Sequence, residues 1–144
     1  MTRSPEVTSR IMSHVRNRGT KPELALRAEL HRRGLRYRVH RRMLGNPDLT
    51  FVTPRVAVFV DGDYWHGNAW RTRGYPDFDS YYGRGENGAF WIGKIRRNIE
   101  RDNEVTEGLR ADGWCVIRVW ETDLAADLAA IADRIETVVR GRPA

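Results

Sequence analysis

The stretch GNPDLTFVTPRVAVFVDGDYWHG, residues 45–67, decides the fold of this chain. It predicts two short strands, residues 48–52 and residues 55–60, joined at Thr53-Pro54. The second strand, RVAVFV, is nearly all apolar and rich in β-branched residues, which is typical of a strand buried on both faces. Asp48 begins the first strand, and further polar side chains crowd the end of the second, so we expect them to meet in a cleft.

These polar side chains are candidates for one site: Asp48, Asp61, Asp63 and His66. Neighbouring carboxylates raise each other's pKa unless a cation lies between them, and hard oxygen ligands suit Mg²⁺. A histidine beside such a metal can take a proton from an attacking water. The set fits hydrolysis of a phosphodiester. It also fits a structural interpretation, because Pro-Asp is a common turn dipeptide and Asp-Gly commonly ends a strand.

Length and composition predict one domain over residues 1–144 with a polyanionic partner. The formal net charge is +6, the pI is about 10.1, and most of the bases are arginines, which suit phosphate contacts. The single cysteine, Cys115, excludes an internal disulfide and a multi-cysteine metal cage, and we interpret it as a small core residue. We expect a cytoplasmic protein without a membrane partner, because no apolar run has membrane-spanning length and no signal-peptide core is present.

Further elements follow from periodicity and from turn residues. Helices are predicted over residues 8–18, from Thr20 to Gly34, over 89–111 and over 123–140. A half-exposed edge strand is predicted over 35–42 and a buried strand over 114–120. We expect residues 68–88 to be irregular. Together these elements predict an α/β fold in which helices flank a mixed central β-sheet on both faces.

Several blocks match one known family in order and spacing. They are Ile11-Met12-Ser13, Thr20-Lys21-Pro22-Glu23, Pro47-Asp48, FVDGxxWHG at residues 59–67, FWxxKIxxNxxRD at 90–102 and GWxVxxVWE at 113–121. Over residues 9–124 the chain thereby resembles the very short patch repair (Vsr) endonucleases. The resemblance implies a restriction-endonuclease-like fold and a Mg²⁺-dependent enzyme. Such an enzyme nicks one strand of double-stranded DNA next to a T:G mismatch and works as a monomer on DNA.

The resemblance also assigns catalytic roles. Asp48 and the backbone carbonyl of Val60 would bind the metal. His66 would activate the attacking water and Asp102 would orient it, with Asp61 and Glu23 as supporting polar groups. Without the resemblance, Asp102 would be a solvated helical acid or a partner of a neighbour on its own helix. Glu23 fits equally well as the last residue of a capping box that begins at Thr20.

Residues that would contact DNA are implied in the same way. Tyr64, Trp65 and Trp91 match the family's intercalating aromatics, and core packing is the alternative for each. Residues 1–19 would form a DNA-contacting arm, with a solvated basic helix as the alternative. We expect phosphate contacts from Arg10, Arg16, Arg18, Lys94 and Arg97. Part of the segment 68–88 would become ordered only on DNA.

The chain departs from the family at a structural zinc site. The positions that hold the zinc ligands in the family are occupied in this chain by Asp63, Asn68, Trp70 and Thr122. A closed zinc site needs four nitrogen or sulfur ligands, so we expect no structural zinc and another means of holding the loop, such as packing of Trp70. The position of Asp61 is a histidine in some members.

Two other functions remain open. A related nuclease could cut without mismatch specificity, as a restriction or phage-defence nickase. A non-catalytic DNA-binding module is the other alternative, although such a module need not retain Asp48, His66 and Asp102 together.

Overall fold

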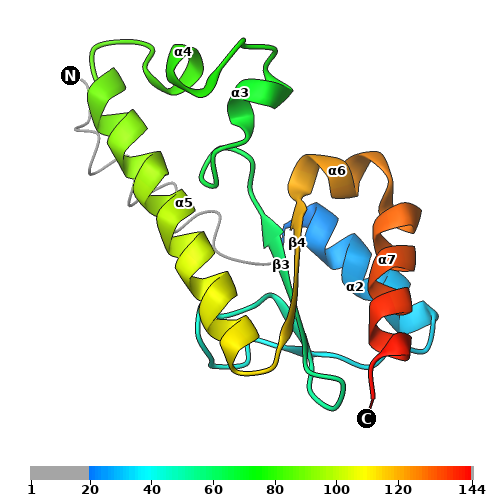
Figure 1. Ribbon diagram of the computed structural model, residues 1–144. Coiled ribbons are helices and arrows are strands. Elements are labelled where there is room, and N and C mark those ends of the chain that lie inside the picture. Colours follow the sequence, from blue (N-terminus) through cyan, green and yellow to red (C-terminus); the bar gives the residue numbers. More distant parts are fainter. Residues whose placement is uncertain (1–19, 144) are drawn as a thin grey trace.

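The computed structural model of the protein describes residues 20–143 (Figure 1). In chain order the elements are α2 (Lys21–Arg32), β1 (Arg38–Val39), β2 (Leu49–Phe51), β3 (Val56–Asp61), α3 (Ala69–Thr72), α4 (Phe78–Tyr82), α5 (Gly88–Ala111), β4 (Cys115–Trp120), α6 (Glu121–Ala126) and α7 (Leu128–Gly141). The predicted helix 8–18 and the arm residues Arg10, Arg16 and Arg18 lie outside the described residues. In the described part of the chain, no helix combines the length and the apolar composition needed to cross a membrane.

The four strands form one sheet in the order β1-β2-β3-β4. The pairs β1–β2 and β2–β3 are antiparallel, and the pair β3–β4 is parallel with Asp61 opposite Trp120. The predicted pair of strands around Thr53-Pro54 is therefore a hairpin. A parallel neighbour needs a long crossover, which α5 supplies. The predicted mixed sheet is confirmed.

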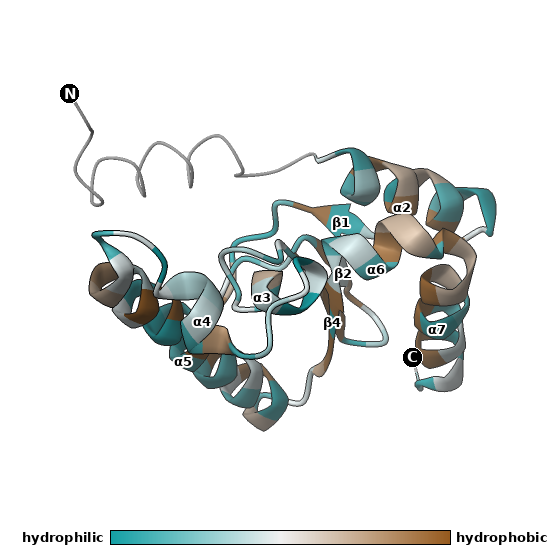
Figure 2. Ribbon diagram, turned by 90° about the horizontal axis from the view of Figure 1, so that it is seen from above, coloured by the Kyte–Doolittle hydropathy of each residue, from teal (hydrophilic) through white to brown (hydrophobic). Residues whose placement is uncertain are grey.

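Alternating side chains of β3 divide the core into two layers. On one face Ala57 and Phe59 pack with Val105 and Leu109 of α5. The other face belongs to a larger cluster that holds α2 and α7 against the sheet and includes Leu26, Leu30, Val56, Val58, Ala132 and Ile135. Figures 1 and 2 show α5 on one side of the sheet and α2, α6 and α7 on the other. Helices thus cover both faces, as the α/β prediction requires.

The segment 68–88 is more regular than predicted, because it contains α3 and α4. Ordering of part of it on DNA stays a prediction. The segment's aromatic residues build a third cluster, in which Trp65, Ala69, Tyr81, Tyr82 and Ile95 are buried and the side chains of Tyr64, Trp70, Tyr75, Phe78 and Trp91 pack around them. Aromatic side chains bury large areas, so this segment forms a small core of its own against α5.

Two predicted element boundaries and the predicted capping box were also wrong. The edge strand covers only Arg38–Val39, because His40 has a positive φ of 57° and ends the extended run. The predicted C-terminal helix is two helices that meet at Asp127, whose side chain accepts a hydrogen bond from the N–H of Ala130 and so caps α7. The capping box is absent at the described start of α2, where the Thr20 side chain makes no capping bond and Glu23 pairs with Arg27 instead.

Candidate active site

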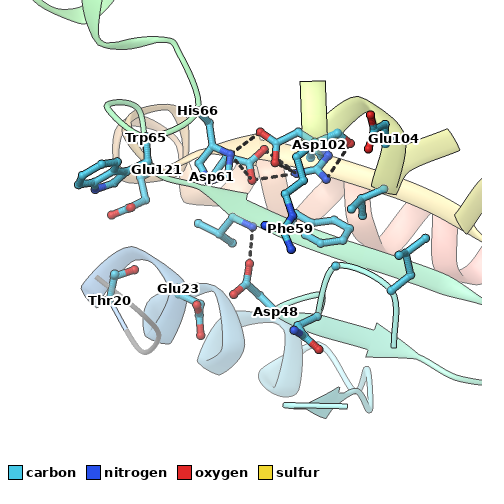
Figure 3. Close-up of a pocket in the computed structure, with 18 residues that line it drawn as sticks. Thr20, Glu23, Asp48, Phe59, Asp61, Trp65, His66, Asp102, Glu104 and Glu121 are labelled. Carbon is cyan, nitrogen blue, oxygen red and sulfur yellow. Dashed lines mark hydrogen bonds and ion pairs between the residues drawn. The ribbon is translucent and has the colours of Figure 1, made fainter. Parts of the chain in front are cut away.

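A cavity of about 490 Å³ lies at the carboxyl end of β3. The residues that line it come from α2, the approach to β2, the end of β3, α5, β4 and the start of α6. Figure 3 shows His66, Asp61 and Asp102 on one side of β3 and Asp48 and Glu23 on the other. The charged and titratable lining residues are Glu23, Asp48, Asp61, His66, Arg101, Asp102, Glu104, Arg118 and Glu121.

His66 is paired with Asp102, which extends from α5. The Nδ1 atom of His66 lies 2.5 Å from Oδ2 of Asp102. An ionised carboxylate can only accept hydrogen bonds, so Nδ1 carries the proton and donates it, which leaves Nε2 as the unprotonated nitrogen. Burial alone lowers the pKa of His66, but the bond to Asp102 and the charge of Asp61 outweigh it and raise that pKa above its usual value. The pair has the arrangement of a general base with an orienting acid.

The turn that carries His66 is held tightly against α5. Gly67 has a φ of 90°, and a Cβ atom at this position would lie 2.5 Å from Cδ1 of Ile99. Asn98 donates to the carbonyl of Trp65 at 3.0 Å. Only glycine allows both this backbone conformation and this close approach, which places His66 within reach of Asp102 on the next turn of the helix.

Asp61 ends β3 and makes an ion pair with Arg118 of β4. Nη1 of Arg118 donates to both Asp61 carboxylate oxygens, at 3.0 and 3.1 Å. Asp61 Oδ1 also lies 3.7 Å from Nδ1 of His66. Burial raises the pKa of Asp61, against the opposing charges of His66 and Arg118.

Asp48 lies directly before β2, which pairs with the edge of β3 opposite to β4. Its N–H donates to the carbonyl of Val58 at 3.0 Å, and its Oδ2 accepts from the N–H of Val60 at 2.7 Å. Burial raises the pKa of Asp48 to about 7; the bond from Val60 opposes that rise, and the negative charge of Glu23 adds to it. A buried carboxyl group beside another acid is a group that a cation would stabilise in its charged form.

The donor set around Asp48 fits a magnesium ion. Backbone groups of a strand alternate between its two edges, so the carbonyl of Val60 faces the same edge as its N–H, beside the Asp48 carboxylate. Over residues 20–143, no cluster of three or more His, Cys, Asp and Glu side chains is placed to hold a metal ion. Mg²⁺ commonly takes one or two protein oxygens and fills its other positions with water and substrate phosphate, so this small oxygen set is sufficient.

Asp63 does not belong to this site, contrary to the prediction. It is buried, and its Oδ1 accepts from Asn68 Nδ2 and from Thr122 Oγ1, both at 2.8 Å, while its Oδ2 accepts from the N–H of Thr122 at 3.2 Å. Three of the four family zinc positions are thus joined by hydrogen bonds. The fourth, Trp70, packs in the aromatic cluster. This network connects the turn after β3 to α6.

The three predicted intercalating residues lie together. Tyr64 and Trp91 have ring centroids 5.8 Å apart, and Trp65 lies 5.0 Å from Tyr64 and 6.0 Å from Trp91. Trp65 is 9% exposed, whereas Tyr64 and Trp91 are half-buried. All three line a second, larger cavity beside the first. The predicted phosphate contacts on α5 differ in exposure, since Arg97 is exposed and Lys94 is half-buried.

Sequence reasoning missed Arg118. An arginine inside the apolar run CVIRVW of a buried strand needs a partner of opposite charge, and this was the available signal. It did not identify which acid would be the partner.

Comparisons with known proteins identify the family of this chain. The sequence model of the family described as DNA mismatch endonuclease Vsr matches residues 2–72. The type II nicking enzyme V.NmeDIP of Neisseria meningitidis serogroup C is 40% identical, over 96% of this chain and 90% of its own length. The type II nicking enzyme V.HpaIIP of Haemophilus parainfluenzae is 42% identical, over 84% of this chain and 82% of its own length. The DNA mismatch endonuclease Vsr of Escherichia coli K12 is 30% identical, over 94% of this chain and 85% of its own length. This chain therefore belongs to the Vsr family and is a DNA endonuclease that acts by nicking.

Proposed function

We propose that this endonuclease uses Mg²⁺ and nicks one strand of double-stranded DNA next to a T:G mismatch, as in very short patch repair. The observation that carries the proposal is the meeting of two groups in one cavity. A histidine oriented by a carboxylate at 2.5 Å lines the same cavity as a buried carboxyl group with a raised pKa. Together they supply the proton acceptor and the metal ligand that phosphodiester hydrolysis needs.

Each residue has a defined part in the proposed mechanism. Asp48 and the carbonyl of Val60 would hold Mg²⁺, which when bound would neutralise charge on the scissile phosphate. His66 accepts a proton from the attacking water at Nε2, since Nδ1 is bonded to Asp102. Asp102 keeps the ring in this tautomer and stabilises it once it is protonated. Asp61 and Glu23 act as supporting acids.

DNA binding rests on positive charge and on the aromatic cluster. The net charge of +6 favours a polyanion, and we expect Arg10, Arg16, Arg18, Lys94 and Arg97 to contact phosphates. Tyr64, Trp65 and Trp91 would wedge between base pairs beside the mismatch. We expect one protein molecule on each site.

A nickase without mismatch specificity is the second candidate. The observation in its favour is that several relatives are named type II nicking enzymes, while one is named a DNA mismatch endonuclease. One assay separates the candidates: nicking of paired T:G and T:A duplexes with Mg²⁺ or with EDTA. The proposal expects nicking of the T:G duplex in Mg²⁺ only. Equal nicking of both duplexes favours the second candidate, and binding without nicking would indicate a non-catalytic module.

A further inference from the structure

Arg118 joins three elements of the active site through one guanidinium group. From β4, its Nε donates to Thr106 Oγ1 at 2.8 Å and its Nη2 donates to the Asp102 carbonyl at 3.3 Å, both on α5. Its Nη1 holds Asp61 at the end of β3. The guanidinium carbon also lies 4.1 Å from the centre of the Phe59 ring. All three guanidinium nitrogens donate hydrogen bonds, each to a different residue. The single ammonium group of a lysine could not reproduce this planar arrangement.

Two carboxylates compete for the same nitrogen of His66. Nδ1 is 2.5 Å from Asp102 and 3.7 Å from Asp61. A ring N–H can make one strong hydrogen bond, so the choice of partner fixes the orientation of the ring. Without a cation beside it, Asp61 would be attracted to a protonated His66 and could turn the ring away from Asp102.

We propose that Arg118 is a positioning residue that holds Asp61 away from His66, so that Asp102 alone orients the imidazole ring. Through the Asp102 carbonyl, Arg118 also fixes the turn of α5 from which this acid extends. The inference rests on the proposed roles of His66 and Asp102, and it adds a residue that touches neither DNA nor metal in that mechanism.

The charged groups around His66 determine the expected pH behaviour. Asp61 faces it from β3, Asp102 from α5 and Arg118 from β4. Other charged residues that line the same cavity are Glu23, Asp48, Arg101, Glu104 and Glu121. Arg118 opposes protonation of His66, whereas both aspartates favour it. Loss of Arg118 therefore moves the acidic limb of the pH–rate profile to higher pH.

The first test is kinetic and uses the full chain with Mg²⁺ and DNA. Arg118→Met keeps the apolar stem, and we expect kcat to fall on the order of 10-fold to 100-fold, as for outer partners of functional histidines. KM for DNA should stay near the wild-type value, and the acidic limb of the pH–rate profile should move to higher pH. The double variant Asp61→Asn with Arg118→Met removes the competing charge as well, so the acidic limb should return toward its wild-type position. It should recover only part of the lost kcat, because Asp61 is itself a supporting acid. Arg118→Lys should be intermediate because it keeps the charge without the fork.

The second test needs neither DNA nor metal. Proton and nitrogen-15 NMR of the His66 ring, assigned with His66→Gln, reports the chemical shift of the Nδ1 proton in the free protein. Wild type should show this proton far downfield, because the short hydrogen bond to Asp102 deshields it. Arg118→Met should move the resonance upfield, because Asp61 then competes for the same proton, and the double variant should restore the wild-type shift. If the protein nicks no DNA, the proposed function is contradicted. The NMR spectrum would still show whether Arg118 positions His66, because it needs neither DNA nor metal.

Arg55→Met is a matched control at the opposite end of the same sheet. Arg55 donates to the Asp112 carbonyl at 2.5 Å and lies 5.3 Å from the Trp114 ring, so it connects the start of β3 to the turn after α5 without facing His66. The control should lower the melting temperature and leave the Nδ1 proton shift and the pH profile unchanged. An Nδ1 proton shift that stays at the wild-type value in Arg118→Met, or a displaced shift that the double variant does not restore, would overturn the proposal.

Discussion

At the scale of single residues, Asp48 carries an unfavourable charge in the metal-free protein. Its pKa is raised to about 7 by burial and by Glu23, well above the value near 4 of an unfolded chain. A group whose folded-state pKa is raised stabilises the fold below its unfolded pKa, and this contribution is lost as the pH rises through the folded pKa. The free energy of unfolding should therefore fall as the pH rises from about 4 to about 7, because Asp48 loses its proton in the folded protein over this range.

Asp48→Asn tests this charge. The variant keeps a neutral side chain, so its melting temperature should exceed that of the wild type by a margin that grows from pH 5 to pH 8. Mg²⁺ should then raise the melting temperature of the wild type at pH 8 and leave the variant unchanged, because a ligand stabilises only the state that binds it. A margin that stays constant with pH would contradict the raised pKa.

Asp48→Ala separates cleavage from binding. Nicking should be abolished, since charge neutralisation at the phosphate is lost, while the dissociation constant for DNA should change only a few-fold because the arginines supply most of the affinity. Gel-shift titration in parallel with a nicking assay measures both. Nicking at near wild-type rate in Mg²⁺ would remove Asp48 from the site.

His66→Ala should reduce kcat by on the order of 10²–10⁴-fold, the range expected for loss of a general base. The measurement is single-turnover nicking at saturating protein. A variant that retains the wild-type rate and its acidic limb would assign the proton transfer to another group.

Single residues differed in how far the sequence predicted them. Asp48 and His66 stand out as polar residues around a buried strand, whereas Asp102 could be linked to His66 only through the family blocks, because 36 positions separate the two. Asp63 looked equally suitable but faces the other side of the turn. Arg118 could be recognised as an unusual buried charge, but its partner depends on the parallel register of β3 and β4, which no local pattern encodes.

At the scale of elements, the long strands and helices were predictable and the short ones were not. β3, β4 and α5 follow from apolar runs and helical spacing. α3 and α4 span only Ala69–Thr72 and Phe78–Tyr82, too short to show a period, and they are stable because their aromatic residues pack together. Tertiary contacts, and not the local sequence pattern, therefore determine the structure of the segment that contains α3 and α4.

The network of Asp63, Asn68 and Thr122 should stabilise the turn without a metal. Asp63→Ala would leave buried donors unpaired, so we expect the free energy of unfolding to fall by about 1–3 kcal/mol. Urea unfolding measures it. Asp127→Ala, which loses a cap at an exposed site, is a control expected to cost about 1 kcal/mol without altering nicking. An unchanged unfolding midpoint in Asp63→Ala would show that the network contributes nothing.

We also propose that the purified protein contains no stoichiometric zinc and keeps its fold in EDTA. The hydrogen bonds at the zinc positions supply the support for this. Elemental analysis that finds one zinc per chain, or a melting temperature that drops in EDTA, would contradict it.

At the scale of the whole molecule, the cavity that contains His66 and the aromatic cluster are adjacent, and Trp65 lines both this cavity and the second one. A wedge inserted beside a T:G pair would therefore bring the scissile phosphate close to His66. Unstacking costs roughly a few kcal/mol per step, and a mismatched pair lowers that cost. The wedge would convert this difference into selectivity.

Replacing Tyr64 and Trp91 together by Ala should flatten the preference for mismatched DNA. Both rings also pack in the cluster, so a fall in melting temperature would show their structural part, and the comparison must be made at a temperature at which the double variant is folded. Discrimination as strong as that of the wild type would exclude these two residues as the wedge.

Mismatch specificity is measured by the single-turnover nicking rate of the wild type on strand-labelled T:G and T:A duplexes of otherwise equal sequence. We predict a single nick in one strand of the T:G duplex in Mg²⁺, a much slower rate on the T:A duplex, and no nick in EDTA. Equal rates on the two duplexes would contradict the mismatch assignment and favour a nickase without mismatch specificity. Nicking that persists in EDTA would contradict the metal-dependent mechanism built on Asp48.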